Sequence, residues 1–323
     1  MKKTLLAVAA LAAAGSVNAA EVYNNEGSTL DINGRAFAIM QVEDSGAGSE
    51  SSISDGGSRL GFTAKHQATE GVAAIGRFEV EYSGAQATKA GTTDEEINIA
   101  FSSRDFYAGL EFTNIGTLTF GRQTTIFDDA AFRGGFDEWY GYSQQLADRG
   151  RDNGIVKFSA NKLVENLTAG VTYQFAQDDN KHRSGFTIAG AYDLPMGLGL
   201  SAGFYDYADE VYAGRATEAN YSGFNLGASY KINAMKFGAD FSMEDQDGTD
   251  VTAWRIGGEY NLNAARIYGG YGEVDADEAD KESGFYAGVG YALGSKTTVF
   301  VEYSQKDTAT DFSGATAGIV VNF

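Results

Sequence analysis

Apolar and polar residues alternate with a period of two along most of the chain. In the segment 221–232, every second residue from Phe224 to Ile232 is apolar, and the residues between them are Asn, Gly, Ser and Lys. The segments 235–244 and 254–262 repeat this alternation. A period of two is typical of half-buried β-strands, so the sequence predicts an all-β fold.

The alternating segments number about 16, as in transmembrane β-barrels whose strands each have roughly ten residues. Short connections alternate with long, acidic or Gly/Ser-rich ones, which is typical of short periplasmic turns and longer outer loops. We therefore predict a 16-stranded antiparallel transmembrane β-barrel over residues 20–323. A soluble β-sandwich is the alternative, but it requires neither an even strand number nor this asymmetry of the turns. The predicted strands are 29–42, 58–68, 72–83, 96–113, 116–122, 151–160, 166–177, 184–194, 197–208, 219–232, 235–246, 251–262, 265–274, 283–293, 296–307 and 312–323.

The first 19 residues have the pattern of a secretory signal peptide. Lys2 and Lys3 precede the apolar run 4–15, and Val17–Ala19 is a small-residue cleavage site. A transmembrane helix is the competing interpretation, but the run is shorter than the roughly 20 apolar residues that a bilayer span needs. The chain contains no cysteine, so we expect an exported protein without disulfides or thiolate chemistry.

Composition narrows the function classes. The chain has 42 Gly, 18 Tyr and 21 Phe but one Pro, and its net charge of -20 becomes -22 once Lys2 and Lys3 are removed. Phosphate binding depends on Lys and Arg, so this acidic excess argues against nucleic acid as a partner. Glycine and aromatic residues are spread evenly to Phe323, which favours one continuous domain.

The longest interval without strand or helix periodicity is 123–150. Loops of this length are uncommon in compact folds and are usually functional or disordered, and the aromatic residues here argue against disorder. We predict that this loop, the third on the long-loop side, folds into the barrel and narrows it. Its candidate constriction carboxylates are Asp128, Asp129, Asp137 and Glu138.

Aromatic side chains and the C-terminus support a membrane barrel. Aromatic residues near strand ends are consistent with interfacial girdles. The last strand ends TAGIVVNF, and its terminal Phe323 resembles the end signature by which bacterial outer-membrane barrels are recognised for insertion. The girdle candidates are Phe112, Phe120, Tyr173, Phe175, Tyr192, Tyr260, Tyr291 and Tyr303.

Four stretches of the mature chain resemble the general diffusion porins of Gram-negative outer membranes. They are the start AEVYNNEGSTLDINGRA, SRLGF at 58–62, GRFEVEYSG at 76–84 and SRDFYAGLEFTNIGTLTFGRQ at 103–123. The terminal AGIVVNF fits the same family. The resemblance follows the whole mature chain in order, and it is carried by the sequence and spacing of the motifs together.

The resemblance implies a homotrimer of 16-stranded barrels, each with its own pore, in which an acidic third outer loop faces a ladder of arginines. Here GGFDEW replaces the family's PEFGG stretch, so Asp137 and Glu138 are the first candidates for the narrowest point and Asp128 and Asp129 are the alternative. The wall positions that match the family are Arg35, Arg59, Arg104 and Arg151.

The free-energy cost of placing a charged side chain in lipid is a separate reason to expect that the arginines of the strands face the barrel interior. A cation that faces lipid near the midplane of a barrel costs roughly 2–4 kcal/mol. Arg59 alternates with Leu60, and Arg77 shares a face with Glu79, so both arginines are expected to face the lumen. Arg104 interrupts the alternation, which predicts a β-bulge or a subunit-facing strand.

Together these features indicate an outer-membrane general diffusion porin that passively passes small hydrophilic solutes and ions. Its acidic excess predicts weak cation selectivity. Expected partners are further copies of the chain, outer-membrane lipid and lipopolysaccharide, and the barrel-assembly machinery. The alternatives are a substrate-specific channel for sugars or organic anions, favoured by Trp139, Tyr140 and Tyr142, a barrel enzyme, and an adhesin or receptor.

The chain offers little for catalysis or metal binding. His66 and His182 lie in unrelated segments, and neither has the neighbouring pattern of an activated nucleophile. The acidic run 275–282 lacks the Gly-punctuated spacing of a calcium loop, so we expect it to solvate an outer loop. No enzyme activity, metal site or cofactor is predicted.

Overall fold

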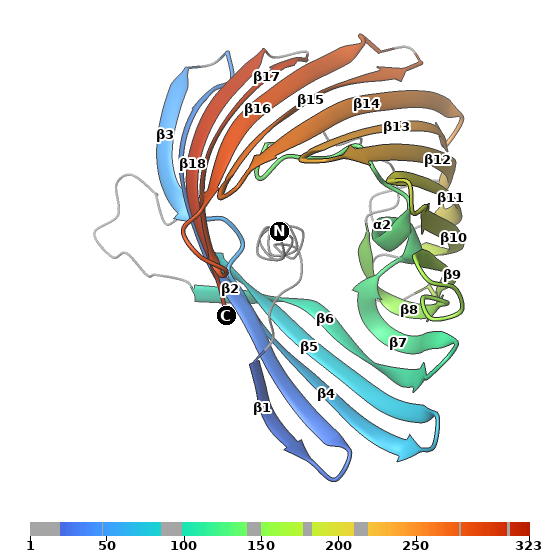
Figure 1. The fold of residues 1–323 in the computed structure, drawn as a ribbon. Coiled ribbons are helices and arrows are strands. Elements are labelled where there is room, and N and C mark those ends of the chain that lie inside the picture. The colour runs from blue at the N-terminus through green and yellow to red at the C-terminus, as the bar shows by residue number, and fades with distance from the viewer. Residues whose placement is uncertain are drawn as a thin grey trace.

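A computed structural model shows a closed β-barrel with a short helix inside it (Figure 1). It describes residues 20–46, 48–84, 99–140, 150–176, 183–209, 219–277, 279–308 and 311–323. The predicted signal peptide, His182, Tyr142 and residues 141–149 of the long loop lie outside the described residues.

Each predicted strand overlaps an observed one, with ends that differ by a few residues. The strands of the barrel wall are β2 (Ser28–Asp44), β4 (Arg59–Thr69), β5 (Val72–Gly84), β6 (Ile99–Phe112), β7 (Gly116–Thr124), β8 (Arg151–Ser159), β9 (Leu167–Gln174), β10 (Arg183–Asp193), β11 (Leu198–Asp209), β12 (Ala219–Ile232), β13 (Met235–Gln246), β14 (Thr249–Leu262), β15 (Ala265–Ala276), β16 (Glu282–Ala292), β17 (Thr297–Asp307) and β18 (Phe312–Asn322).

The wall closes between its first and last strands. All neighbours pair antiparallel, and β18 joins β2 from the Asn322–Arg35 pair to the Ser313–Asp44 pair. Of the 18 strands in the described part of the chain, β1 and β3 stand outside the ring, so 16 strands form it. Closure leaves the wall no open edge, as a β-structure in lipid requires.

Three elements were not predicted. β1 (Ala20–Asn25) pairs with the first residues of β2, and β3 (Ser49–Asp55) pairs with its last residues. The helix α2 (Ile126–Ala130) lies within 123–150, the interval without strand or helix periodicity. A five-residue helix is too short to leave a 3.6-residue periodicity in the sequence.

The polarity of the wall is the reverse of that in a soluble protein. On β12–β14 the apolar side chains of Leu226, Phe241 and Ile256 are 40–53% exposed, whereas Asn225 and Asp240 are at most 3% exposed. A soluble sandwich would bury the apolar face. The predicted girdle residues follow the same pattern, since all but the half-buried Phe112 are exposed on the outer face.

Connections at one end of the barrel are short and those at the other end are mostly long. The shortest connection at the second end is that between β13 and β14, where Asp247 and Gly248 form a two-residue turn with φ of 58° and 88°. Positive φ at both central residues matches the right-handed twist of the flanking strands. This turn therefore shortens the rim at the end that otherwise carries the long loops.

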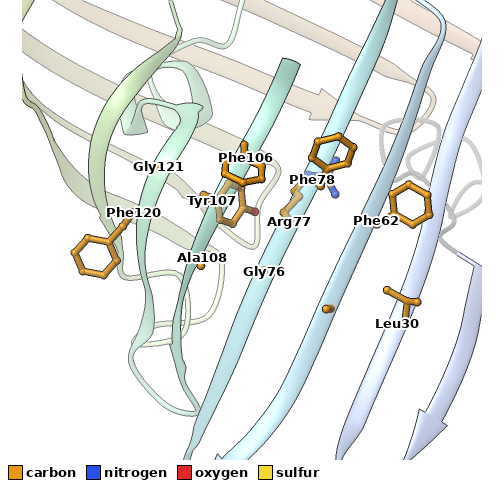
Figure 2. A pocket seen from close by; sticks show the side chains of 11 residues that line it. Leu30, Phe62, Gly76, Arg77, Phe78, Phe106, Tyr107, Ala108, Phe120 and Gly121 are labelled. Carbon is orange, nitrogen blue, oxygen red and sulfur yellow. The ribbon is translucent and has the colours of Figure 1, made fainter. Parts of the chain in front are cut away.

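A groove of about 500 Å³ lies on the outer face of β2 and β4–β7 (Figure 2). The rings of Phe62, Phe78 and Phe106 stand along it, and the small residues Gly76 and Ala108 leave it hollow. Phe78 and Phe106 are 40% and 64% exposed. The groove is therefore part of the apolar outer face and not of the barrel interior.

Candidate functional site

The segment between β7 and β8 begins with α2, which packs against the inner face of the wall (Figure 1). Phe127 is 1% exposed and meets Tyr205 of β11 edge-on, with ring centroids 5.2 Å apart. Gly203 permits this contact, because a Cβ there would lie 2.7 Å from the Phe127 ring. The first turn of the segment is thus fixed by apolar contacts to β10 and β11.

Asp240 of β13 holds the middle of the segment. Its carboxylate accepts hydrogen bonds from the backbone N–H groups of Arg133 and Gly134, each at 2.7 Å, and from Arg255 Nε at 2.7 Å. A Cβ at Gly238 would lie 2.1 Å from the Arg133 carbonyl oxygen. The backbone of the segment therefore lies directly on the inner face of β13.

Glu302 of β17 holds the next part of the segment. Its carboxylate accepts hydrogen bonds from the backbone N–H groups of Glu138 at 2.8 Å, Trp139 at 3.4 Å and Tyr140 at 2.5 Å. The Tyr268 hydroxyl donates a fourth hydrogen bond at 2.9 Å. Hydrogen bonds to a charged acceptor are about twice as strong as neutral ones, so Glu302 is a strong anchor.

Aromatic contacts extend the segment to the seam between β18 and β2. The ring of Trp139 meets Phe37 of β2 at 5.8 Å, and the ring of Tyr140 meets Phe312 of β18 at 5.7 Å, both edge-on. The described residues of the segment therefore follow the inner wall from β9 round to β2. We call residues 125–140 the inner segment.

Two of the predicted loop carboxylates lie near Glu302. Glu138 pairs with Arg266 of β15, which also pairs with Glu259 at 2.8 Å, and Asp137 is exposed. Burial raises the pKa of Glu138 above its ordinary value, the nearby Glu302 and Asp137 carboxylates act in the same direction, and Arg266 opposes them. The cation that Glu138 contacts is thus not one of the predicted arginines.

The other predicted pair lies at the start of the inner segment. Asp129 pairs with Lys157 of β8 at 2.7 Å and accepts a hydrogen bond from Thr124 Oγ1 at 2.8 Å. Asp128 and Asp129 are both exposed. The two predicted acidic pairs therefore lie at different ends of the inner segment, each beside its own cation.

The structure brings four of the five predicted wall arginines into one ion-pair network on the inner faces of β4, β5, β6 and β8, and the fifth, Arg35 of β2, lies beside it. Glu79 lies at its centre, with one Arg77 Nη2 contact at 2.5 Å, one Arg104 Nε contact at 3.0 Å and one Arg59 Nη1 contact at 3.7 Å. Asp105 joins Arg77 and Arg151, at 2.8 Å from each Nε. We call this the arginine network; its members are Arg59, Arg77, Arg104, Arg151, Glu79, Glu81 and Asp105.

The predicted bulge at Arg104 is confirmed. Asp105 pairs with Glu79 and Ser103 pairs with Val80, so Arg104 is the extra residue between two paired positions. The bulge lets Arg104 contact both Glu79 and Glu81, although its neighbour Asp105 also faces the interior. The alternation therefore resumes beyond a single displaced residue.

Arg35 lies beside the network and is held by backbone and ring contacts. Its Nε donates a hydrogen bond to the Gly57 carbonyl at 2.9 Å, and its guanidinium lies 5.1 Å from the centroid of the Phe37 ring. Arg35 is also directly opposite Arg59 in the β2–β4 register. Two guanidinium groups therefore share this part of the wall.

Several residues of the candidate site were not predicted from the sequence. The polar phase of the strands marked the faces of those that lie in strands, but no sequence signal showed their partners, which lie up to 164 residues away. These residues are Asp105, Arg133, Asp240, Arg255, Arg266 and Glu302.

The C-terminal residue closes the barrel. Gly34 N–H donates to the Phe323 carbonyl at 3.1 Å, and Phe323 N–H donates to the Gly34 carbonyl at 3.0 Å. A Cβ at Gly34 would lie 2.6 Å from the Phe323 ring, so glycine makes room for the terminal aromatic. The role of Phe323 in membrane insertion remains a prediction.

No helix in the described ranges is long and apolar enough to cross a membrane. Over the same ranges, no group of three or more His, Asp or Glu side chains is arranged to hold a metal ion.

Comparison with known proteins identifies relatives over nearly the whole chain. Residues 6–311 match a family model described as Gram-negative porin. A major outer membrane protein of Pasteurella multocida strain Pm70 is 29% identical over 330 residues, which cover 94% of this chain and 92% of the relative. The outer membrane porin protein OmpD of Citrobacter koseri is 28% identical over 290 residues, which cover 85% and 70%.

Solved porins share the fold. OmpF of Salmonella typhi in complex with daunomycin has a TM-score of 0.75 at 18% identity, covering 94% of this chain and 100% of that one. The trimer form of Vibrio cholerae OmpT has a TM-score of 0.71 at 19% identity, and an anion-selective porin of Comamonas acidovorans has 0.72 at 16%, each covering 92% and 100%.

These relatives carry the names of porins and outer-membrane proteins, not of enzymes. The closed barrel and the matching family place the protein in the outer membrane of a Gram-negative bacterium. The match over residues 6–311 shows that this chain belongs to the Gram-negative porin family.

Proposed function

We propose that the protein is a general diffusion porin, which forms a water-filled channel for passive passage of small hydrophilic solutes and ions. The observation that carries this proposal is the polar inner face of a closed wall of 16 strands. Barrels of about 16 strands are wide enough to leave an aqueous channel. Passage through such a channel needs no covalent chemistry.

The inner segment is the proposed constriction. It is fastened to the wall by Asp240 and Glu302, so it takes up part of the lumen along β9–β18 while the arginine network stays on the facing strands. Solutes would pass between the segment and the network. Its exposed carboxylates Asp128, Asp129 and Asp137 would then meet the solute stream.

Weak cation selectivity is part of the proposal. The chain carries a net charge of -20, and the arginines contact Glu79, Glu81 and Asp105, which offset most of their positive charge. The fold alone does not decide the sign, since an anion-selective porin has a similar structure. The selectivity therefore depends on the balance of these side chains.

We also propose a homotrimer that contacts outer-membrane lipid and lipopolysaccharide and is inserted by the barrel-assembly machinery. The solved trimer form of a protein with this fold supports the trimer, and the exposed apolar outer face supports contact with lipid. Residues 1–19 are the proposed export signal.

A substrate-specific channel is the second candidate, and its expected sign is a track of exposed aromatic residues along the lumen. The described inner-face aromatics beneath the inner segment are instead buried, which favours the general channel. They are Phe37, Tyr205, Tyr207, Tyr268, Tyr286 and Phe300, and Phe136 and Tyr140 of the segment itself are buried too.

Swelling of proteoliposomes in a series of uncharged sugars tests the proposal. A general channel predicts rates that fall smoothly with sugar size and do not saturate with concentration. Saturation or preference between stereoisomers of equal size would favour the substrate-specific channel. Absence of swelling, with correctly folded protein in the vesicles, would point to an adhesin or receptor.

A further inference from the structure

Glu79 of β5 is the most highly connected carboxylate of the arginine network. It contacts Arg59 of β4, Arg77 of its own strand and Arg104 of β6. Asp105 contacts two arginines, and Glu81 contacts one. One carboxylate thus serves guanidinium groups from three adjacent strands.

Glu79 is also the most deeply buried of these carboxylates. Its side chain is 3% exposed, compared with 12% for Asp105 and 27% for Glu81. A buried carboxylate remains ionised only where cations and hydrogen bonds replace its hydration. Three guanidinium groups supply that replacement, so the site holds a negative charge behind the arginines.

Removal of this charge would change the field in the lumen more than removal of an exposed one. Interactions between exposed charges are screened by salt within about 8–10 Å, whereas partly buried pairs are screened less. Without Glu79, three arginines would each lose a counter-charge. Arg77 would keep Asp105 and Arg104 would keep Glu81, but the positive charge that Glu79 no longer offsets would attract anions and repel cations at the wall.

We propose that Glu79 is the principal selectivity-determining carboxylate of this channel, and that it acts by offsetting the charge of the arginines rather than by touching the solute. This inference rests on the proposed channel function. In this inference, the charge balance of the arginine network decides whether cations or anions are preferred. The carboxylates of the inner segment make a smaller contribution to this preference.

The test is the permeability ratio of K⁺ to Cl⁻, measured as a reversal potential in a KCl gradient across planar bilayers. Glu79→Gln should lower the ratio at least about two-fold, because neutral glutamine removes one of the three carboxylates that offset the guanidinium charges. Glu79→Asp keeps the charge and should retain the wild-type ratio, which a merely structural role of the longer side chain would not predict. The shift should diminish in molar salt.

Glu111→Gln is the matched control. Glu111 is also an inner-wall carboxylate between two cations, Lys65 at 2.6 Å and Lys162 at 2.8 Å, but it lies outside the arginine network. Its neutralisation should shift the ratio less than that of Glu79. Equal shifts, or no shift in a channel of Glu79→Gln with normal conductance, would overturn the proposal.

A double-mutant comparison serves if Glu79→Gln alone does not insert. The double variant Arg77→Gln with Glu79→Gln should be less cation-selective than Arg77→Gln alone, and equal ratios would contradict the inference.

Failure of the proposed function is distinguishable from failure of this inference. An anion-selective wild type would refute weak cation selectivity, yet the shift on loss of Glu79 would still be measurable.

Discussion

The two halves of the inner wall use buried carboxylates for different purposes. On β2–β8, Glu79 and Asp105 contact arginines of the same strand or of strands one or two positions away in the sheet, 2–46 residues away in sequence. On β13 and β17, Asp240 and Glu302 instead accept hydrogen bonds from backbone N–H groups 106–164 residues away. The same residue type thus balances charge on one half and docks the inner segment on the other.

This difference separates selectivity from pore shape. Changes in the arginine network should alter the field in the lumen and leave the inner segment in place. Changes on the docking half should release the segment and alter conductance. The following variants test this division, from the largest expected effect to the smallest.

Phe127→Ala should give the largest loss of docking. Deletion of a buried phenylalanine side chain typically costs about 3–5 kcal/mol, here from the attachment of α2 to β10 and β11. We expect faster protease cleavage of the 123–150 loop and larger current fluctuations in single channels. Phe241→Ala is the control, because Phe241 is 40% exposed on the outer face. Equal protease resistance in wild type and Phe127→Ala would contradict the docking role.

Glu302→Gln should loosen the other end of the inner segment. Glutamine places an NH₂ group where a carboxylate oxygen accepted a hydrogen bond, so we expect a cost of about 1–3 kcal/mol. Single-channel conductance and current noise should both change, while the permeability ratio should change less than with Glu79→Gln. Ser304→Ala, on the same face of β17, is the control, and a matching response from it would count against a specific anchor.

Neutralising the carboxylates of the inner segment should have an intermediate effect on selectivity. Asp137→Asn with Glu138→Gln, and separately Asp128→Asn with Asp129→Asn, should each lower the preference for K⁺ by about two-fold or less. The pair nearer the narrowest point should give the larger change in reversal potential. If neither pair alters it, the inner segment is not the constriction.

Acidification should produce the smallest effect. The pKa of Glu138 is raised above the ordinary value of 4.5, so on acidification this carboxylate becomes neutral at a higher pH than a free glutamate. The K⁺ preference should therefore begin to fall above pH 4.5. Glu138→Gln should remove this component from a pH series of reversal potentials, and an unchanged pH profile would show that Glu138 does not contribute.

The sequence predicted the wall well because each wall strand must turn apolar residues to lipid and polar residues inward. β1 and β3 lie outside the ring, and β3 has the sequence SESSISD, whose composition is that of a polar, serine-rich loop. Its strand conformation comes from pairing with β2, which requires no apolar face. The bulge at Arg104 was predictable because it interrupts an otherwise regular alternation.

The candidate site was only partly predictable. The phase of the strands placed Arg59 and Arg77 inside, the family resemblance placed Arg35, Arg104 and Arg151 on the wall, and the structure joins all of them except Arg35 through shared carboxylates. The anchors Asp240 and Glu302 have the same sequence pattern as any polar residue that faces water. Their roles depend on backbone N–H groups that lie more than 100 residues away in the sequence. Neither the periodicity of a strand nor the spacing of its residues gives information on such distant contacts. Whether the joined residues control permeation remains a proposal.

The central claim is that the inner segment narrows the conducting pore. The chain has no cysteine, so a single cysteine introduced at the exposed Asp137 can be modified selectively with a bulky thiol reagent. Ile256→Cys, 53% exposed on the outer face, is the control. With both proteins labelled to completion, the account predicts a large fall in single-channel conductance for Asp137→Cys and none for Ile256→Cys. Unchanged conductance in labelled Asp137→Cys would contradict it.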